Sequence, residues 1–283
     1  MTHSTHSKAW LGYLFLFYAA FCIALPYFLI HWWPSQLPKP QIQQPKAEAP
    51  TRSSKAEKPV NIAEMKQAFF EKLVPVVKSE NQKNTKQRQR LLSLYTGLND
   101  TSAPLNPQQQ ALLQSLAIQY RVPAAMDDQA LLEQLLVRVD QVPASMVIAQ
   151  AAIESAWGRS RFALEANNYF GQWCFTQGCG VVPKRRNSGA SHEVAKFNSI
   201  DAAVAAYLRN INSHPAYAEV RQKRLEARQQ QRQPDSLEMI QGLAQYSARG
   251  EKYIEELQSL IGFNRLQRFD TKDTDFNQSA NAE

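Results

Sequence analysis

Cysteine is scarce in this sequence: the 283 residues contain three cysteines, and no two of them form a Cys-x-x-Cys pair. This absence excludes a redox site of the Cys-x-x-Cys type. A zinc site is a poor match as well, because it would have only two thiols and one imidazole, from Cys174, Cys179 and His192, and no Cys-x-x-Cys pair. The five-position spacing of Cys174 and Cys179 favours instead a disulfide across a short loop in an oxidising compartment. We expect neither a metal nor a cofactor.

The sequence also lacks any RNP-like, zinc-finger or other recognisable nucleic-acid motif. Its 32 basic and 25 acidic residues give a net charge of +7. Such a balance suits an anionic partner, which could be nucleic acid, a lipid surface or a cell-wall polymer. Without a motif, the charge is weak support for nucleic acid, so we do not expect that partner. The hydrophobic content of 44% is sufficient for one or two domains with a real core.

Charged residues are absent from Trp10 to Trp33, if His31 is neutral. This run of about 24 residues is long enough to cross a membrane, and it has aromatic residues at both ends. A cleaved signal peptide is the alternative, but the run is long for one and no small-x-small cleavage site follows it. We therefore predict a transmembrane anchor at residues 1–33. Residues 34–60 have no hydrophobic period and are rich in Pro, Gln and Lys, which predicts a linker without regular structure.

Residues 61–140 show apolar spacings of three and four, which predict a helical extension. Pro75 is expected to kink or end its first helix. Asn106-Pro107 and Asp127-Asp128 are expected to begin two further helices. The basic stretch from Lys83 to Arg90 is either a patch for an anionic polymer or a solvated helix face.

The segment from Pro143 to Gly171 carries the chemistry, and it runs PASMVIAQAAIESAWGRSRFALEANNYFG. Its first part lacks any charge that would give it a solvated face, so we predict a buried helix that ends near Gly158. Glu154 then lies in the last turn, beside Trp157. Desolvation and the negative end of the helix dipole both disfavour the ionised carboxylate, so its pKa should be raised. A protonated carboxyl near neutral pH suits a general acid, whereas a local structural role is the alternative.

The run Gln150 to Gly158 (QAAIESAWG), Ser160 and the run Ala166 to Gly171 (ANNYFG) resemble the signature of glycoside hydrolase family 73. Its members are bacterial cell-wall glucosaminidases with the approximate pattern QAxLESGWGxS followed by ANNLFGxK. The resemblance extends over about residues 141–263, and it departs from the family pattern after Gly171. It implies that Glu154 is the catalytic acid of a hydrolase acting on peptidoglycan.

Five residues near Glu154 are candidates for binding the sugar. The Asn amides suit acetamido and hydroxyl groups, and the aromatic faces suit a pyranose ring. Turn formation is the alternative for the asparagines, and core packing is the alternative for Phe170. These candidates are Trp157, Asn167, Asn168, Tyr169 and Phe170.

Two further residues complete the predicted catalytic set. The resemblance places Glu193 where family members carry a second carboxylate in a flexible β lobe, which would hold or deprotonate the attacking water. Glu165 is a weaker candidate for that role. Tyr246 matches by position a tyrosine that lines the family's active site, although the residues around it differ. Ordinary surface charge is the alternative for Glu193, and a structural role is the alternative for Tyr246. We expect Tyr253 to be a core residue.

The resemblance implies a mainly α fold, with a lysozyme-like α lobe and a small β-hairpin lobe, after an N-terminal transmembrane helix. We expect a catalytic domain at residues 141–268 and a disordered tail at 269–283. The expected activity is hydrolysis of the β-1,4 bond after N-acetylglucosamine in peptidoglycan glycan strands. A lytic transglycosylase and a non-catalytic glycan-binding protein are the alternatives. We expect a monomer in the inner membrane with a periplasmic catalytic domain, although the basic residues flanking the anchor do not favour that orientation.

Overall fold

The computed structural model describes residues 61–101, 104–123, 125–184, 186, 189–244 and 249–270. The predicted anchor, the linker, Tyr246 and residues 271–283 of the predicted tail lie outside these residues. The first two residues of that tail are described: Phe269 ends the short helix η3 (Leu266–Phe269) and Asp270 accepts hydrogen bonds from Ser145, so the prediction of disorder from residue 269 is wrong at its start. Among the helices that the structure describes, none is both long and apolar enough to cross a membrane. The prediction of an anchor at residues 1–33 therefore stays a prediction.

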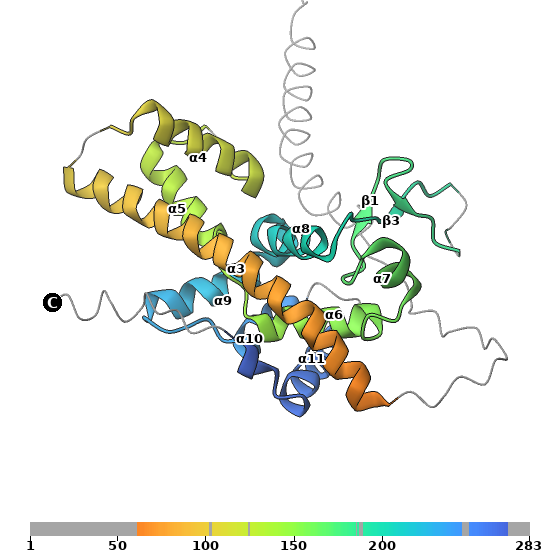
Figure 1. Cartoon of the computed structure of the whole chain (residues 1–283). Helices are drawn as coiled ribbons and strands as arrows, with labels where there is room; N and C mark the ends of the chain where they lie inside the picture. The colour runs from red at the N-terminus through yellow and green to blue at the C-terminus, as the bar shows by residue number, and fades with distance from the viewer. Residues whose placement is uncertain are drawn as a thin grey trace, which may run out of the picture. The chain divides into compact units, whose positions relative to one another are not determined.

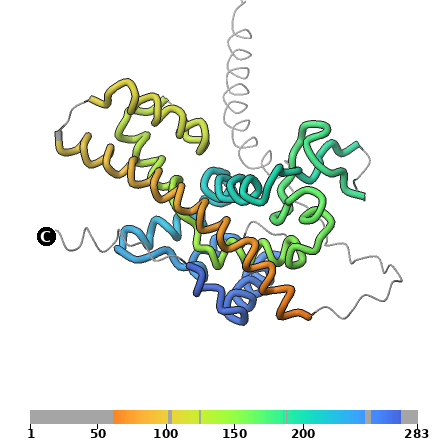
Figure 2. The backbone as a smooth tube through the Cα atoms, viewed as in Figure 1, coloured from red at the N-terminus to blue at the C-terminus, as the bar shows by residue number. Residues whose placement is uncertain are grey.

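One long helix, α3 (Ile62–Thr101), runs past most of the other elements (Figures 1 and 2). It continues through Pro75, where the sequence predicts a kink or an end. The first half of α3 places four buried apolar side chains in the main core, namely Phe69, Phe70, Leu73 and Val77. Its second half contributes Leu91 to a separate, smaller core. A single helix therefore belongs to two cores.

The smaller core is closed by α4 (Pro107–Tyr120) and α5 (Asp128–Arg138), which pack on each other. Helix α5 also packs on α3, and α4 reaches α3 through the Tyr120 hydroxyl, which contacts Asn84 and Gln87. Asn106 begins α4 in a capping box with Gln109, and Asp127 caps α5 by accepting a hydrogen bond from the N–H of Ala130. Each cap satisfies backbone donors that have no partner inside the helix. The predicted starts of both helices are confirmed.

The main core surrounds α6 (Ala144–Ser155), in which every residue from Ala144 to Ala152 is buried. Helices α3 and α11 and the short helix η3 pack against α6. No side chain of its N-cap residue caps α6; instead, the carboxylate of Asp270 accepts hydrogen bonds from the N–H and the hydroxyl of Ser145, each at 2.7 Å. The remaining helical elements are α8 (Ile200–Ser213), η1 (Pro215–Tyr217), α9 (Ala218–Gln229), α10 (Ser236–Met239), η2 (Ile240–Leu243), α11 (Glu251–Phe263) and η3 (Leu266–Phe269).

A small antiparallel sheet follows α7 (Arg161–Ala166). Its strands are β1 (Trp173–Cys174), β2 (Gly180–Val181) and β3 (Glu193–Ala195), in the order β1-β3-β2. The last strand in the sequence is thus the central one, because Val194 pairs with both Trp173 and Val181. At Gly180 an added Cβ would lie 2.0 Å from the carbonyl oxygen of Val194, so only glycine fits there. The prediction of a mainly helical fold with a small β element is confirmed.

A buried charge cluster fixes the loop that leads into α6. Asp140 is 2% exposed and pairs with Arg88 of α3 and with Arg224 and Arg228 of α9, at 3.5, 3.8 and 2.9 Å. Burial alone would raise the pKa of the Asp140 carboxyl, but the three guanidinium groups outweigh it and hold that pKa below its usual value. Asp140 therefore remains ionised and joins α3 to α9 directly before α6.

Candidate active site

Glu154 lies in the last turn of α6, where the backbone turns sharply. The helix ends at Ser155, before the predicted Gly158, and the next three residues all have positive φ: 50° at Ala156, 61° at Trp157 and 76° at Gly158. Left-handed backbone costs a non-glycine residue on the order of 1 kcal/mol. The Ser155 hydroxyl holds the turn by accepting the N–H of Gly158 at 2.7 Å. The turn places the carboxyl of Glu154 at the end of an otherwise buried helix.

The environment of Glu154 raises the pKa of its carboxyl to near neutral pH. Burial raises its pKa from 4.5 to about 7, although a hydrogen bond from Tyr253 and the positive charge of Arg249 act in the opposite direction. The Tyr253 hydroxyl donates to Glu154 Oε1 at 3.2 Å. Desolvation is thus the dominant cause, as the apolar sequence of α6 predicts.

A chain of buried hydrogen bonds orients this carboxyl. The Tyr207 hydroxyl donates to Gln150 Oε1, and Gln150 Nε2 lies 3.1 Å from the Tyr253 hydroxyl that reaches Glu154. Three helices, α6, α8 and α11, contribute these side chains. The sequence gives Tyr253 only a core position, and it is indeed fully buried. The signal that could have identified it is that a buried tyrosine needs a partner for its hydroxyl.

Glycine at position 171 leaves space beside the other oxygen of Glu154. A Cβ added to Gly171 would lie 3.6 Å from Glu154 Oε2, and the φ of Gly171 is +63°. A larger side chain would therefore reach the acidic oxygen and would also strain the backbone.

The Asn-Asn-Tyr-Phe turn supports the site from within. Asn168 is 1% exposed, and its amide donates to the carbonyls of Gln172 and Ala195 at 2.8 and 2.9 Å. Tyr169 and Phe170 are 2% and 3% exposed, and the ring of Phe170 stacks on Tyr207 with centroids 4.0 Å apart. In this conformation none of the three presents a free face to a sugar, so turn formation and core packing describe them better than the predicted sugar contacts.

Asn167 and Trp157 are both partly exposed. Asn167 ends α7 in a left-handed conformation, with φ 52°, and donates to the carbonyl of Phe197 at 2.9 Å. The indole of Trp157 packs edge-on against Phe69 and Phe70 of α3, with centroids 5.4 and 5.9 Å apart. Helix α3 therefore supports the turn that carries Trp157 directly after Glu154.

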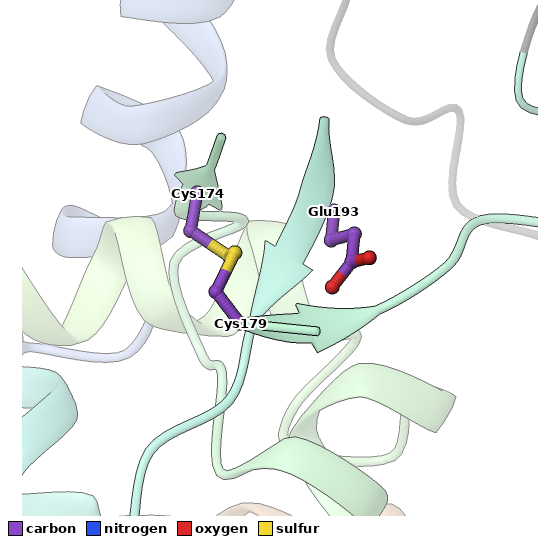
Figure 3. A group of neighbouring side chains, drawn as sticks. All are labelled: Cys174, Cys179 and Glu193. Carbon is purple, nitrogen blue, oxygen red and sulfur yellow. A yellow bond between two sulfur atoms is a disulfide. The ribbon is translucent and has the colours of Figure 1, made fainter. Parts of the chain in front are cut away.

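Glu193 lies in the sheet beside a disulfide between Cys174 and Cys179 (Figure 3). Its two carboxylate oxygens accept the N–H groups of Gly178 and Gly180 at 3.0 and 2.8 Å. These hydrogen bonds hold the pKa of the Glu193 carboxyl below its usual value. Glu193 is ionised and fastens the disulfide loop to β3, so its predicted role in activating water stays a prediction.

The sulfur atoms and the carboxylate of this group lie within 4.8 Å of one another. Metal binding by cysteine requires free thiolates. Because these sulfur atoms are bonded to each other, the group does not offer them as ligands, and the disulfide is the arrangement that the structure has.

Comparison with known proteins identifies the same region. A family described as mannosyl-glycoprotein endo-beta-N-acetylglucosaminidase, or glucosaminidase, matches residues 131–266. Protein bax of Escherichia coli (strain K12) is 34% identical over 190 residues, which are 66% of this chain and 65% of that relative's length. No solved structure matches the chain. The family match includes Glu154, Tyr253 and the small sheet, so residues 131–266 resemble a glucosaminidase domain, and the chain spans slightly less than two thirds of the length of that relative.

Proposed function

We propose that this protein is a peptidoglycan hydrolase that cleaves the β-1,4 glycosidic bond after N-acetylglucosamine, with Glu154 as the general acid. The observation that carries the proposal is the largely buried Glu154 carboxyl, whose pKa of about 7 leaves a substantial protonated fraction at neutral pH. An acid with a pKa near the operating pH is an efficient proton donor to a leaving oxygen. The family match supplies the glycan class.

In the proposed reaction, the Glu154 proton passes to the bridging oxygen as the bond from that oxygen to the anomeric carbon breaks. Water then adds to the anomeric carbon and loses a proton. Glu193 would accept this proton after leaving its hydrogen bonds to Gly178 and Gly180, or the acetamido group of the substrate would take part. Exchange with solvent restores the proton on Glu154.

Tyr253 has a positioning role in this mechanism. Its hydroxyl fixes Glu154 Oε1, and the other oxygen, which lies beside Gly171, is the one that would donate the proton. When Glu154 loses its proton, the same hydrogen bond stabilises the carboxylate that forms. The same proposal includes a lysozyme-like arrangement, in which an α lobe and a β lobe surround the glycan. It also includes a membrane anchor at residues 1–33 and a periplasmic location of the domain.

The test compares the full-length protein with Glu154→Gln on purified peptidoglycan, with the fragments identified by mass spectrometry. Glu238→Gln is the matched control, because Glu238 is an exposed carboxylate that pairs with Arg232. We expect fragments with reducing-end N-acetylglucosamine from the wild type and from Glu238→Gln, and none from Glu154→Gln. Anhydro-sugar products would indicate a lytic transglycosylase, and the absence of products from every protein would indicate a glycan-binding module. Protease accessibility of the C-terminal part in intact cells tests the location.

A further inference from the structure

A cavity of about 380 Å³ lies between α3, α4 and α8, and its lining contains none of the residues around Glu154. We call it the basic cavity, because four of its lining side chains are cationic and only Glu80 is acidic. It is lined by Glu80, Lys83, Asn84, Lys86, Gln87, Arg90, Gln119, Tyr120, Ala205, Leu208 and Arg209. The basic stretch of the sequence thus faces a concave site rather than only open solvent.

The positive charge in the basic cavity is mostly uncompensated. Lys83 pairs with Glu80 at 2.5 Å. Lys86, Arg90 and Arg209 have no ion-pair partner among the residues that the structure describes. Three like charges from two helices that share one concavity repel one another, and a bound anion would relieve that repulsion.

Amide side chains stand beside these cations. The hydroxyl of the buried Tyr120 lies 3.3 Å from Asn84 Oδ1 and 3.1 Å from Gln87 Oε1. The single hydroxyl proton of Tyr120 can serve only one of these oxygens at a time, and among the described residues the NH₂ groups of Asn84 and Gln87 make no other hydrogen bond, so they can donate to a ligand. A site with cations, amide donors and an apolar wall at Leu208 suits a ligand with carboxylates and peptide groups.

We propose that the basic cavity binds the acidic stem peptide of peptidoglycan, an inference that rests on the proposed function in its choice of polymer. Neutral sugars do not need three cations, whereas a stem peptide offers both carboxylates and amides. On α3, Lys86 lies 17 residues after Phe69, the residue that contacts Trp157. This separation corresponds to about 25 Å along the helix between the basic cavity and the turn after Glu154. The peptide would thus belong to a neighbouring part of the wall polymer and would hold the strand while another sugar is cleaved.

The test measures binding of a synthetic Ala-γ-Glu-Lys-Ala peptide with free carboxylates to the full-length protein by calorimetry. The variant is the triple substitution Lys86→Gln, Arg90→Gln and Arg209→Gln, all at exposed positions. The matched control removes the same charge elsewhere, with Lys223→Gln, Arg232→Gln and Arg265→Gln. Circular dichroism verifies the fold of each variant.

We expect the triple variant to lose at least tenfold in affinity, the control to bind as the wild type does, and amidation of the carboxylates to abolish binding. Salt should weaken wild-type binding more steeply than that of the triple variant. Equal binding by the triple variant, no binding by the wild type, or tighter binding of inorganic tripolyphosphate or an oligonucleotide than of the peptide would each overturn the inference. Peptide binding does not depend on Glu154. A fragment assay that shows no glycosidase activity would therefore contradict the proposed function without contradicting peptide binding.

Discussion

The substitution Tyr253→Phe tests whether the hydrogen-bond chain sets the acidity of Glu154. It removes one hydroxyl from a fully buried ring and leaves the packing of that ring unchanged. It removes the 3.1 Å contact with Gln150 Nε2 and the 3.2 Å hydrogen bond to Glu154 Oε1, and the second of these favours the ionised carboxylate. Its loss should therefore raise the pKa of Glu154 further above its ordinary value.

The size of the change follows from the energy of the hydrogen bond. A hydrogen bond to a charged group contributes about 1.5 to 3 kcal/mol, and one pH unit corresponds to about 1.4 kcal/mol. The distance of 3.2 Å places this bond at the weak end of that range. We therefore expect the pKa to rise by about one unit, from about 7 to about 8.

The assay is the pH dependence of kcat/KM for release of peptidoglycan fragments. A general acid works only while protonated, so the wild type should lose activity as the pH rises through about 7. In Tyr253→Phe this alkaline limb should move to about pH 8, while kcat falls because Glu154 is less well oriented. The control is Tyr95→Phe, which removes an exposed hydroxyl that lies 3.3 Å from Glu133 Oε1, far along the chain from the residues around Glu154. An alkaline limb that stays in place, or moves to lower pH, would refute the role given to Tyr253.

Three further predictions concern stability. The folded-state pKa of Glu154 exceeds its ordinary value of 4.5, so the native state loses stability as the pH rises from about 4.5 to about 7. At pH 8 the variant Glu154→Gln should therefore be more stable than the wild type by up to about 3 kcal/mol, measured by urea unfolding. At pH 4 this difference should be absent. Asp140→Ala leaves the arginines around it buried without their carboxylate and should cost about 3 to 5 kcal/mol by the same method, whereas Asp127→Ala, at a helix cap, should cost only about 1 kcal/mol. Replacing Cys174 and Cys179 together with serine should cost about 2 kcal/mol, the entropy of the short loop, and an added reductant should lower the Tm of the wild type but not that of the double variant.

Local signals predict the helices and the acid well. Asn106 and Asp127 cap the helices that they were expected to begin, because a cap depends only on the next three residues. The raised pKa of Glu154 follows from the apolar sequence of α6 itself. Both features are set within a few residues of the side chain concerned, and a single sequence contains that information.

Long-range partners escape the same reasoning. Tyr253 is 99 positions from Glu154 in the sequence, and its spacing on α11 fits any core residue. The hydrogen bonds of Glu193 to Gly178 and Gly180 depend on strand β3 entering the sheet between β1 and β2. Neither contact has a local pattern, so the sequence offers Glu193 as a catalytic candidate and leaves Tyr253 in the core.

The packing of α3 bears on what the catalytic unit is. The family match begins at residue 131, after α3. Yet the first half of α3 buries four apolar side chains in the main core, and Asn81 exchanges two hydrogen bonds with the backbone of Val142, at 2.7 and 3.1 Å, just before α6. At about 1.5 to 3 kcal/mol for each buried side chain, those four contribute about 6 to 12 kcal/mol, which is comparable with the whole stability of a domain. Helix α3 also supports the turn at Trp157, so the position of Glu154 on α6 depends on a helix that lies outside the matched segment. The smallest unit able to hold Glu154 in place therefore begins near residue 61.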